Sequence, residues 1–191
     1  MNRILLVSLT ALIVAVACKK IEATSAALST KEVAANAALI DYDSPRGDFT
    51  CRAPRFWKAE EGASAADVIS FIGPPTPRGM TFIHIFRHPS KTDRESNARK
   101  YAESFREIDP AGKRPQLETK RISNADVIFF HQERPQPQLH SKKTVRLERH
   151  DYALIPTKNG FFEIIHSAAA DHFQETLPIF DAIVRSFKSK I

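Results

Sequence analysis

Apolar and polar residues alternate along several short stretches of the chain, and this period of two predicts β-strands. In residues 49–53, Phe49, Cys51 and Ala53 share one face, and the turn residues before them allow 39–42 to pair back as a partner strand. Further stretches with strand character are 67–72, 80–86, 118–133, 144–155 and 161–168. Asn159-Gly160 predicts a hairpin between the last two, whereas 134–138 is too rich in proline for a sheet interior and is predicted as a turn.

Two other stretches have the period of an α-helix. The first follows a capping box at 92–95, and the second carries Pro178, which predicts a break or restart of the helix with Thr176 as a candidate N-cap. Their apolar stripes consist of Ala98, Tyr101, Ala102, Phe105 and Ile108, and of Phe173, Leu177, Phe180, Val184 and Phe187. A second capping box at 29–32 leaves two alternatives for 30–40, a short helix or a solvated tether.

The order of these elements is strands, a helix, three strands and a final helix. Strands joined by short turns pair in an antiparallel manner, and the amphipathic helices need an apolar surface to cover. The pattern therefore predicts one α+β domain with an antiparallel sheet and helices packed against it.

The N-terminus has the composition of a targeting segment. Arg3 provides a positive start and residues 4–17 are apolar or small, too few to span a bilayer as a helix. No polar spacer separates this run from Cys18, and residues 15–18 (Ala-Val-Ala-Cys) resemble the lipobox of a bacterial lipoprotein, although Ala15 stands where leucine is usual. The resemblance implies a signal peptide at 1–17 and attachment of lipid at Cys18.

Three consequences follow from the lipoprotein interpretation. Residues 18–41 become a lipidated tether and 42–191 the folded domain, held to the bilayer by acyl chains. The absence of Asp after Cys18 resembles outer-membrane sorting in a Gram-negative cell envelope, with the domain facing the periplasm. The alternative is a soluble secreted or periplasmic protein in which Cys18 pairs with Cys51; if Cys18 is lipidated, Cys51 is a lone buried hydrophobe.

Several short motifs in 42–188 resemble the PsbP-like (DcrB-like) family. They are Gly47-Asp48-Phe49, Pro54, Trp57, Phe71-Ile72-Gly73-Pro74, Ile155-Pro156-Thr157, Gly160-Phe161-Phe162 and the stretch from Phe180 to Phe187. The family, which includes a yeast Ran-binding protein, shares an α/β/α sandwich around a central antiparallel β-sheet. Its known members act mainly by binding or stabilising other proteins, so the resemblance implies a non-catalytic binding or complex-assembly domain.

The sequence carries no recognisable catalytic or cofactor motif. A P-loop, G-x-S-x-G and H-E-x-x-H are all missing, and no cofactor or metal is expected. Among seven histidines, His131 and His166 lie at predicted sheet ends where they could meet across neighbouring strands, but no carboxylate stands out as a further ligand. A metal- or small-ligand-binding envelope domain, or an enzyme with an unrecognised site, therefore remain as alternatives.

The charge of the chain is mildly basic, +6 in total. The densest cluster predicts a patch for an anionic envelope polymer or an acidic envelope protein, and it consists of Arg134, Lys142, Lys143, Arg146 and Arg149. No aromatic residues are interleaved with these cations, so a nucleic-acid partner is not expected. The sequence leaves the oligomeric state undetermined.

Overall fold

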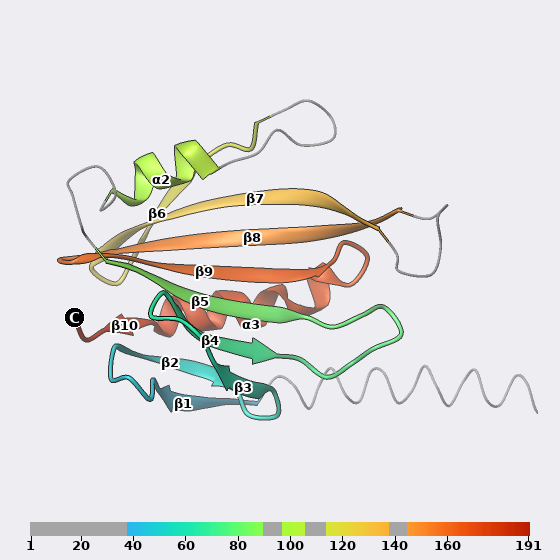
Figure 1. The fold of residues 1–191 in the computed structure, drawn as a ribbon, viewed down its shortest axis with the longest axis horizontal. Helices are drawn as coiled ribbons and strands as arrows, with labels where there is room; N and C mark the ends of the chain where they lie inside the picture. The colour runs from blue at the N-terminus through green and yellow to red at the C-terminus, as the bar shows by residue number, and fades with distance from the viewer. Residues whose placement is uncertain (1–37, 90–96, 106–113, 138–144) are drawn as a thin grey trace, which may run out of the picture. The chain divides into compact units, whose positions relative to one another are not determined.

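The computed structural model describes residues 38–89, 97–105, 114–137 and 145–191, and residues 39–191 form one compact unit. Its largest element is a seven-stranded antiparallel sheet in the order β3-β4-β5-β9-β8-β7-β6 (Figure 1). The strands of this sheet are β3 (Lys58–Glu61), β4 (Asp67–Ile72), β5 (Phe82–Pro89), β6 (Glu118–Ile122), β7 (Ala125–Pro137), β8 (Val145–Thr157) and β9 (Gly160–Ala169). A smaller sheet in the order β1-β2-β10 contains β1 (Leu39–Asp43), β2 (Phe49–Pro54) and β10 (Lys188–Ser189).

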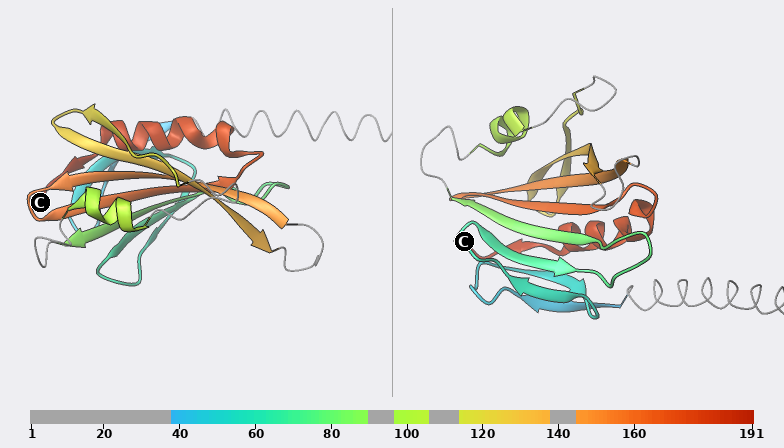
Figure 2. Two further views of the ribbon diagram at one scale, coloured as in Figure 1. Left: turned by 90° about the horizontal axis from the view of Figure 1, so that it is seen from above. Right: turned by 45° about the vertical axis from the view of Figure 1, so that its right-hand side comes forward.

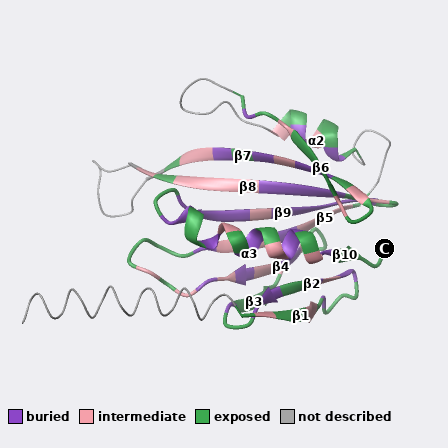
Figure 3. Cartoon of the chain, turned by 180° about the vertical axis from the view of Figure 1, so that it is seen from behind, coloured by how far each residue is buried: buried purple, intermediate pink, exposed green. Residues whose placement is uncertain are grey.

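The described helices α2 (Ala98–Phe105) and α3 (Phe173–Ser186) lie on opposite sides of the long strands (Figure 2). On the α3 side, the core includes residues of β2, β4, β5, β8 and β9. On the α2 side, Ala98 and Ala102 pack against Phe130, Tyr152 and neighbouring side chains. Figure 3 shows the central strands buried along much of their length, as expected for a sheet covered on both faces.

The predicted hairpins are present, with one difference in the turn. The pair Thr157↔Gly160 closes the β8–β9 hairpin around Lys158 and Asn159, and Gly160 follows with a φ of 119° that favours glycine. The pairing of 39–42 with the strand at 49–53 is also confirmed, as β1 and β2. Strands β3 and β10 are too short to give a period-two pattern and were not predicted.

The single strand predicted over 118–133 is wrong, because the chain reverses within it. Strand β6 ends at Ile122, Ser123 and Asn124 form the turn, and β7 begins at Ala125. Ser123 adopts a φ of 52°, in the left-handed region that a two-residue hairpin commonly requires. Serine is a weaker signal for that conformation than glycine or asparagine, which is why the turn was missed.

The turn predicted at 134–138 is also wrong as far as the described residues extend, because β7 continues to Pro137. Pro135 pairs with Leu147, and Pro137 pairs with Val145. Strand β6 pairs with β7 only up to Phe129, so among the described residues the rest of β7 is an edge strand. Proline is tolerated at an edge when its nitrogen faces away from the neighbouring strand.

Helix α2 confirms the apolar stripe over the described part of the first predicted helix. The amide oxygen of Asn97 accepts hydrogen bonds from the backbone N–H groups of Arg99 and Lys100, at 3.0 and 3.2 Å, and so caps this helix. The capping box at 92–95 and the predicted end at Ile108 lie outside the described residues. Of the helix considered for 30–40, residues 30–37 also lie outside, and Leu39 and Ile40 belong to β1.

The predicted break at Pro178 is wrong, because α3 runs continuously from Phe173 to Ser186 with Pro178 inside it. Proline removes the hydrogen bond that its N–H would donate to the residue four positions earlier. Buried side chains on both sides of Pro178, such as Phe173 and Phe180, hold the helix against the sheet in spite of this loss. Thr176 is therefore an internal helix residue, and its hydroxyl lies 3.3 Å from the carbonyl oxygen of Phe173.

Candidate functional site

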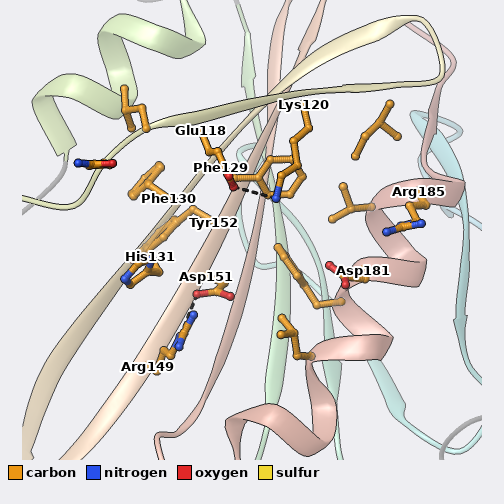
Figure 4. A pocket seen from close by; sticks show the side chains of 16 residues that line it. Glu118, Lys120, Phe129, Phe130, His131, Arg149, Asp151, Tyr152, Asp181 and Arg185 are labelled. Atoms are coloured by element: carbon orange, nitrogen blue, oxygen red, sulfur yellow. Dashed lines mark hydrogen bonds and ion pairs between the residues drawn. The ribbon is translucent and has the colours of Figure 1, made fainter.

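A pocket of about 500 Å³ lies between α3 and strands β6, β7 and β8 (Figure 4). Its volume is in the range of small-molecule sites in proteins. The side chains around it are Gln116, Leu117, Glu118, Lys120, Ile122, Phe129, Phe130, His131, Arg149, Asp151, Tyr152, Leu177, Phe180, Asp181, Val184 and Arg185. The pocket is thus bounded by α3 on one side and by the β6–β7 hairpin on the other.

The apolar part of the pocket is only partly covered by the protein itself. Phe180 and Val184 are buried at its base, whereas Ile122, Phe129 and Leu177 are half-buried against the core. Covering these three side chains with an apolar group would stabilise a complex by about 25 cal/mol for each Å² removed from water. The pocket can therefore bind an apolar group.

The polar part contains two ion pairs, one on β8 and one on β6, with β7 between these strands. Arg149 Nε lies 3.1 Å from Asp151 Oδ1, and the Arg149 guanidinium lies 4.6 Å from the ring centre of Phe173. Lys120 Nζ lies 2.8 Å from Glu118 Oε2 and 5.3 Å from the ring centre of Phe129. Both cations are thus already engaged by a carboxylate and an aromatic face.

Two charged side chains of α3, Asp181 and Arg185, also face the pocket (Figure 4). No ion pair or hydrogen bond joins either side chain to another residue in the described part of the chain. Burial raises the pKa of Asp151; Arg149 and His131 counteract this shift, and the nearby charge of Asp181 adds to it. The charges of Asp151 and Asp181 thus act on each other, and of the two carboxylates Asp181 has no ion-pair partner in the described part of the chain.

His131 and His166 do occupy one row of the sheet, but Asp151 of β8 lies between them. His131 is exposed at the pocket, whereas His166 is fully buried with its Nε2 2.9 Å from Thr176 Oγ1. Burial, followed by the charge of Arg149, lowers the pKa of His166 to about 3. The two imidazoles are thus not brought together, and in the described ranges no group of three His, Cys, Asp or Glu side chains could hold a metal ion.

The predicted basic patch is divided between the two faces of the sheet. Arg149 faces α3, while Arg146 lies three residues earlier and so on the opposite face of β8, where it pairs with Asp171 at 3.1 Å. Arg134 donates a hydrogen bond to Gln132 Oε1 at 3.1 Å. Lys142 and Lys143 lie outside the described residues. The described arginines therefore do not form one continuous surface.

Cys51 is a free thiol on β2 and is buried, and burial raises its pKa to about 12. Its environment agrees with the interpretation of Cys51 as a core residue. The signal peptide, Cys18 and the tether up to residue 37 lie outside the described residues. No helix in the part of the chain that the structure describes is both long and apolar enough to cross a membrane.

The sequence alone did not single out the residues of the pocket. Strand alternation places Phe129 and His131 on one face of β7, and Arg149 and Asp151 on the matching face of β8. Asp181 and Arg185 flank the apolar stripe of α3 at a spacing of four. These two patterns locate the pocket only when the β6–β7 turn and the strand order are known.

The sequence matches no family model and no curated protein. Solved structures do match. A crystal structure from Bacteroides thetaiotaomicron is similar over 79% of this chain, with a TM-score of 0.50 and 12% identity, and this chain spans about half of it (48%). LpqN of Mycobacterium tuberculosis, which is involved in cell envelope biogenesis, is similar with a TM-score of 0.51 and 10% identity over 79% of this chain and 90% of its own.

The Ran-binding protein Mog1p of Saccharomyces cerevisiae is also similar, with a TM-score of 0.50 and 7% identity over 80% of this chain and 95% of its own. At identities this low, the likeness extends to the fold. The predicted fold class is therefore confirmed: the chain has an α+β fold in which helices flank a central antiparallel sheet, as in these similar structures.

Proposed function

We propose that the protein is a bacterial envelope lipoprotein whose folded domain binds a partner and supports its assembly or stability, without catalysing a reaction. The pocket beside α3 is the binding site. The observation that carries this proposal is the half-covered apolar surface of Phe129 and Leu177 next to the charged side chains of Asp151, Asp181 and Arg185. Such a combination is typical of ligand sites, in which a few polar groups orient a ligand over an apolar surface.

Two similar structures support binding rather than catalysis. Mog1p binds Ran and LpqN takes part in cell envelope biogenesis, so this fold supports protein recognition in one case and an envelope role in the other. The signal-peptide-like segment at 1–17 supports export of the protein, and the lipobox-like residues 15–18 support its attachment to a membrane through Cys18. Because similar folds carry unrelated functions, the proposal depends on the pocket and the N-terminus more than on the fold.

The serine–histidine contacts of the domain also favour a non-catalytic role. Ser70 Oγ lies 2.7 Å from His84 Nδ1, and Ser167 Oγ lies 2.7 Å from His150 Nδ1. Both serines are on inner strands of the sheet, where backbone N–H groups pair with the neighbouring strands. An acyl-transfer site needs free N–H donors for the oxyanion, and an inner strand offers none.

A second candidate function is the binding of a small molecule in the same pocket. Its volume of about 500 Å³ favours this candidate, because it is large enough for an ordinary metabolite. Cross-linking distinguishes the two candidates, because a bound protein gives an adduct of higher mass whereas a metabolite does not.

The anchor is tested by metabolic labelling with an alkyne palmitate. We expect the wild-type protein to be labelled and to sediment with membranes, and Cys18→Ser to lose both properties. Equal labelling of the two proteins would contradict lipidation at Cys18. Cys51→Ser is the matched control, because a buried thiol should not influence labelling.

The binding site is tested with a photo-crosslinking amino acid placed at Arg185 on the rim of the pocket. Glu103, an exposed residue of α2 on the other side of the sheet, is the matched control position. In intact cells we expect discrete adducts from position 185 and a much lower yield from position 103. Equal yields from the two positions would contradict the choice of this pocket.

A further inference from the structure

The outer edge of β7 offers backbone groups beside the pocket. The pair Ile122↔Ala125 closes a two-residue hairpin, so the backbone groups of Ala125, Val127 and Phe129 point toward β6. The alternation continues along β7, and the N–H and C=O groups of His131 and Glu133 therefore point away from β8. No backbone group of another described residue pairs with them.

The same alternation places Pro135 and Pro137 at the next two outward-facing positions. Proline has no N–H to offer, so pairing at this edge is limited to His131 and Glu133 on one side. On the other side β6 occupies the edge up to Phe129. The open stretch is thus short and has a defined register, unlike the long uninterrupted edges that promote aggregation.

The open edge and the pocket share a residue, because His131 lies on the edge and its side chain lines the pocket. A strand added beside His131 would alternate its side chains between the two faces of the sheet. Every second side chain would then point toward α3, where Phe129 and Leu177 are half-buried.

Two charged side chains next to this apolar surface, Asp181 and Arg185, have no partner among the described residues, whereas Arg149 and Lys120 already have carboxylate partners. Asp181 also faces Asp151, whose pKa its charge raises. A Lys or Arg side chain of a ligand would reduce the repulsion between the two carboxylates.

We infer that the site binds an extended peptide segment of a partner protein, which adds as a strand to β7 at His131 and Glu133 and places an apolar and a basic side chain in the pocket. Main-chain hydrogen bonds then supply affinity, and the pocket supplies specificity, as in other cases of strand addition. This inference rests on the proposed function, since it names the partner that the binding site takes.

The test uses peptides selected by phage display on the protein from residue 18 onward, carrying Cys18→Ser. We expect selected peptides to share an apolar residue and a basic residue in alternating positions. The main comparison is between His131→Pro and His131→Ala, because both remove the imidazole and only the first removes the backbone N–H. Affinity of a selected peptide, measured by fluorescence anisotropy, should fall at least about tenfold further in the proline variant, since each 1.4 kcal/mol of lost hydrogen bonding is a factor of ten.

Glu133→Pro and Glu133→Ala repeat the comparison at the next outward position, in case His131→Pro does not fold. Asp181→Ala should also weaken binding, while Glu103→Ala, at an exposed position of α2 on the other side of the sheet, should not. The inference is overturned if both proline variants bind like their alanine counterparts, or if selection enriches no peptide. Cross-linked adducts could still form at position 185 in cells while neither His131→Pro nor Glu133→Pro lowers the affinity for the peptide. That result would support the proposed function and refute strand addition.

Discussion

The two faces of the sheet differ in how their acidic side chains are paired. Under α2, the carboxylate of Glu163 is buried, yet its Oε2 lies 2.8 Å from His88 Nε2 and accepts a hydrogen bond from the Tyr101 hydroxyl at 3.0 Å. The ring of His88 also stacks on Phe161, with 4.5 Å between the ring centres. On the α3 side, Asp151 and Asp181 face a pocket that the protein leaves open.

This difference distinguishes polar groups that stabilise the fold, under α2, from polar groups that are available to a ligand, in the pocket beside α3. Burial, followed by the charge of Glu163, raises the pKa of Tyr101, so the phenol remains a hydrogen-bond donor at any physiological pH. The polar cluster under α2 is therefore satisfied within the protein and attaches α2 to the sheet. In the pocket, Asp181 and Arg185 have no ion-pair or hydrogen-bond partner among the described residues, so the hydrogen-bonding capacity of these two side chains is available to a ligand.

The largest expected effect on stability comes from removing Glu163, the central residue of the polar cluster that it forms with His88 and Tyr101 under α2 (the α2 cluster). Glu163→Ala should lower the free energy of unfolding by about 3–5 kcal/mol, because it leaves His88 and the Tyr101 hydroxyl without their buried partner. Guanidinium unfolding followed by the fluorescence of Trp57 measures this loss. Glu163→Gln is the matched control and should lose less, since its amide oxygen still accepts a hydrogen bond; a loss below about 1 kcal/mol in Glu163→Ala would contradict the structural role.

The next effect depends on pH and concerns His166 on the α3 side. Its pKa is lowered to about 3 in the fold, from 6.5, so the unfolded chain takes up a proton below pH 6.5 that the folded protein does not. This group therefore reduces stability as the pH falls from about 6.5 to about 3, by up to about 1.4 kcal/mol per pH unit, and has no effect on the slope above that window.

The variant His166→Gln should reduce this acid slope, because glutamine does not titrate and can still contact Thr176. The pKa of His84 is also lowered by burial, so part of the wild-type slope should remain. Urea unfolding at a series of pH values measures both slopes. Identical slopes for the variant and the wild type would show that His166 is protonated in the folded protein.

A smaller effect is expected from Tyr101→Phe, which removes the phenol donor and keeps the ring. The loss should be about 1.5–3 kcal/mol, the cost of removing one hydrogen bond to a charged group. Tyr101 stacks on Phe105 and contacts Phe161, and both contacts survive in the variant. An unchanged stability would mean that α2 is held by packing alone.

The smallest effect on stability is expected on the pocket side. Asp181→Ala should change the free energy of unfolding by less than about 0.5 kcal/mol, because its side chain is exposed and has no described partner. Thermal and guanidinium unfolding measure this change. A loss of more than 1 kcal/mol would assign Asp181 a structural role and weaken the contrast between the faces.

Much of the fold could be predicted because period and turn chemistry are local. The stripes at Ala98–Phe105 and at Phe173–Phe187 and the hairpin at Asn159-Gly160 need no knowledge of distant residues. Pro135 and Pro178 misled the prediction, because each is tolerated only through its tertiary position, at a strand edge and in a helix packed on the sheet. The pocket could not be predicted, because it joins β6, β7, β8 and α3, whose proximity depends on the strand order.

The most direct test of the account is to fill the pocket without disturbing the α2 cluster. Leu177→Trp places a larger apolar side chain over Phe129, and the photo-crosslinker at Arg185 reports binding in intact cells. We predict that the yield of adducts falls at least about tenfold, while the free energy of unfolding stays within about 1 kcal/mol of the wild-type value. An unchanged yield of adducts in a folded Leu177→Trp protein would show that the partner binds elsewhere and would contradict the account.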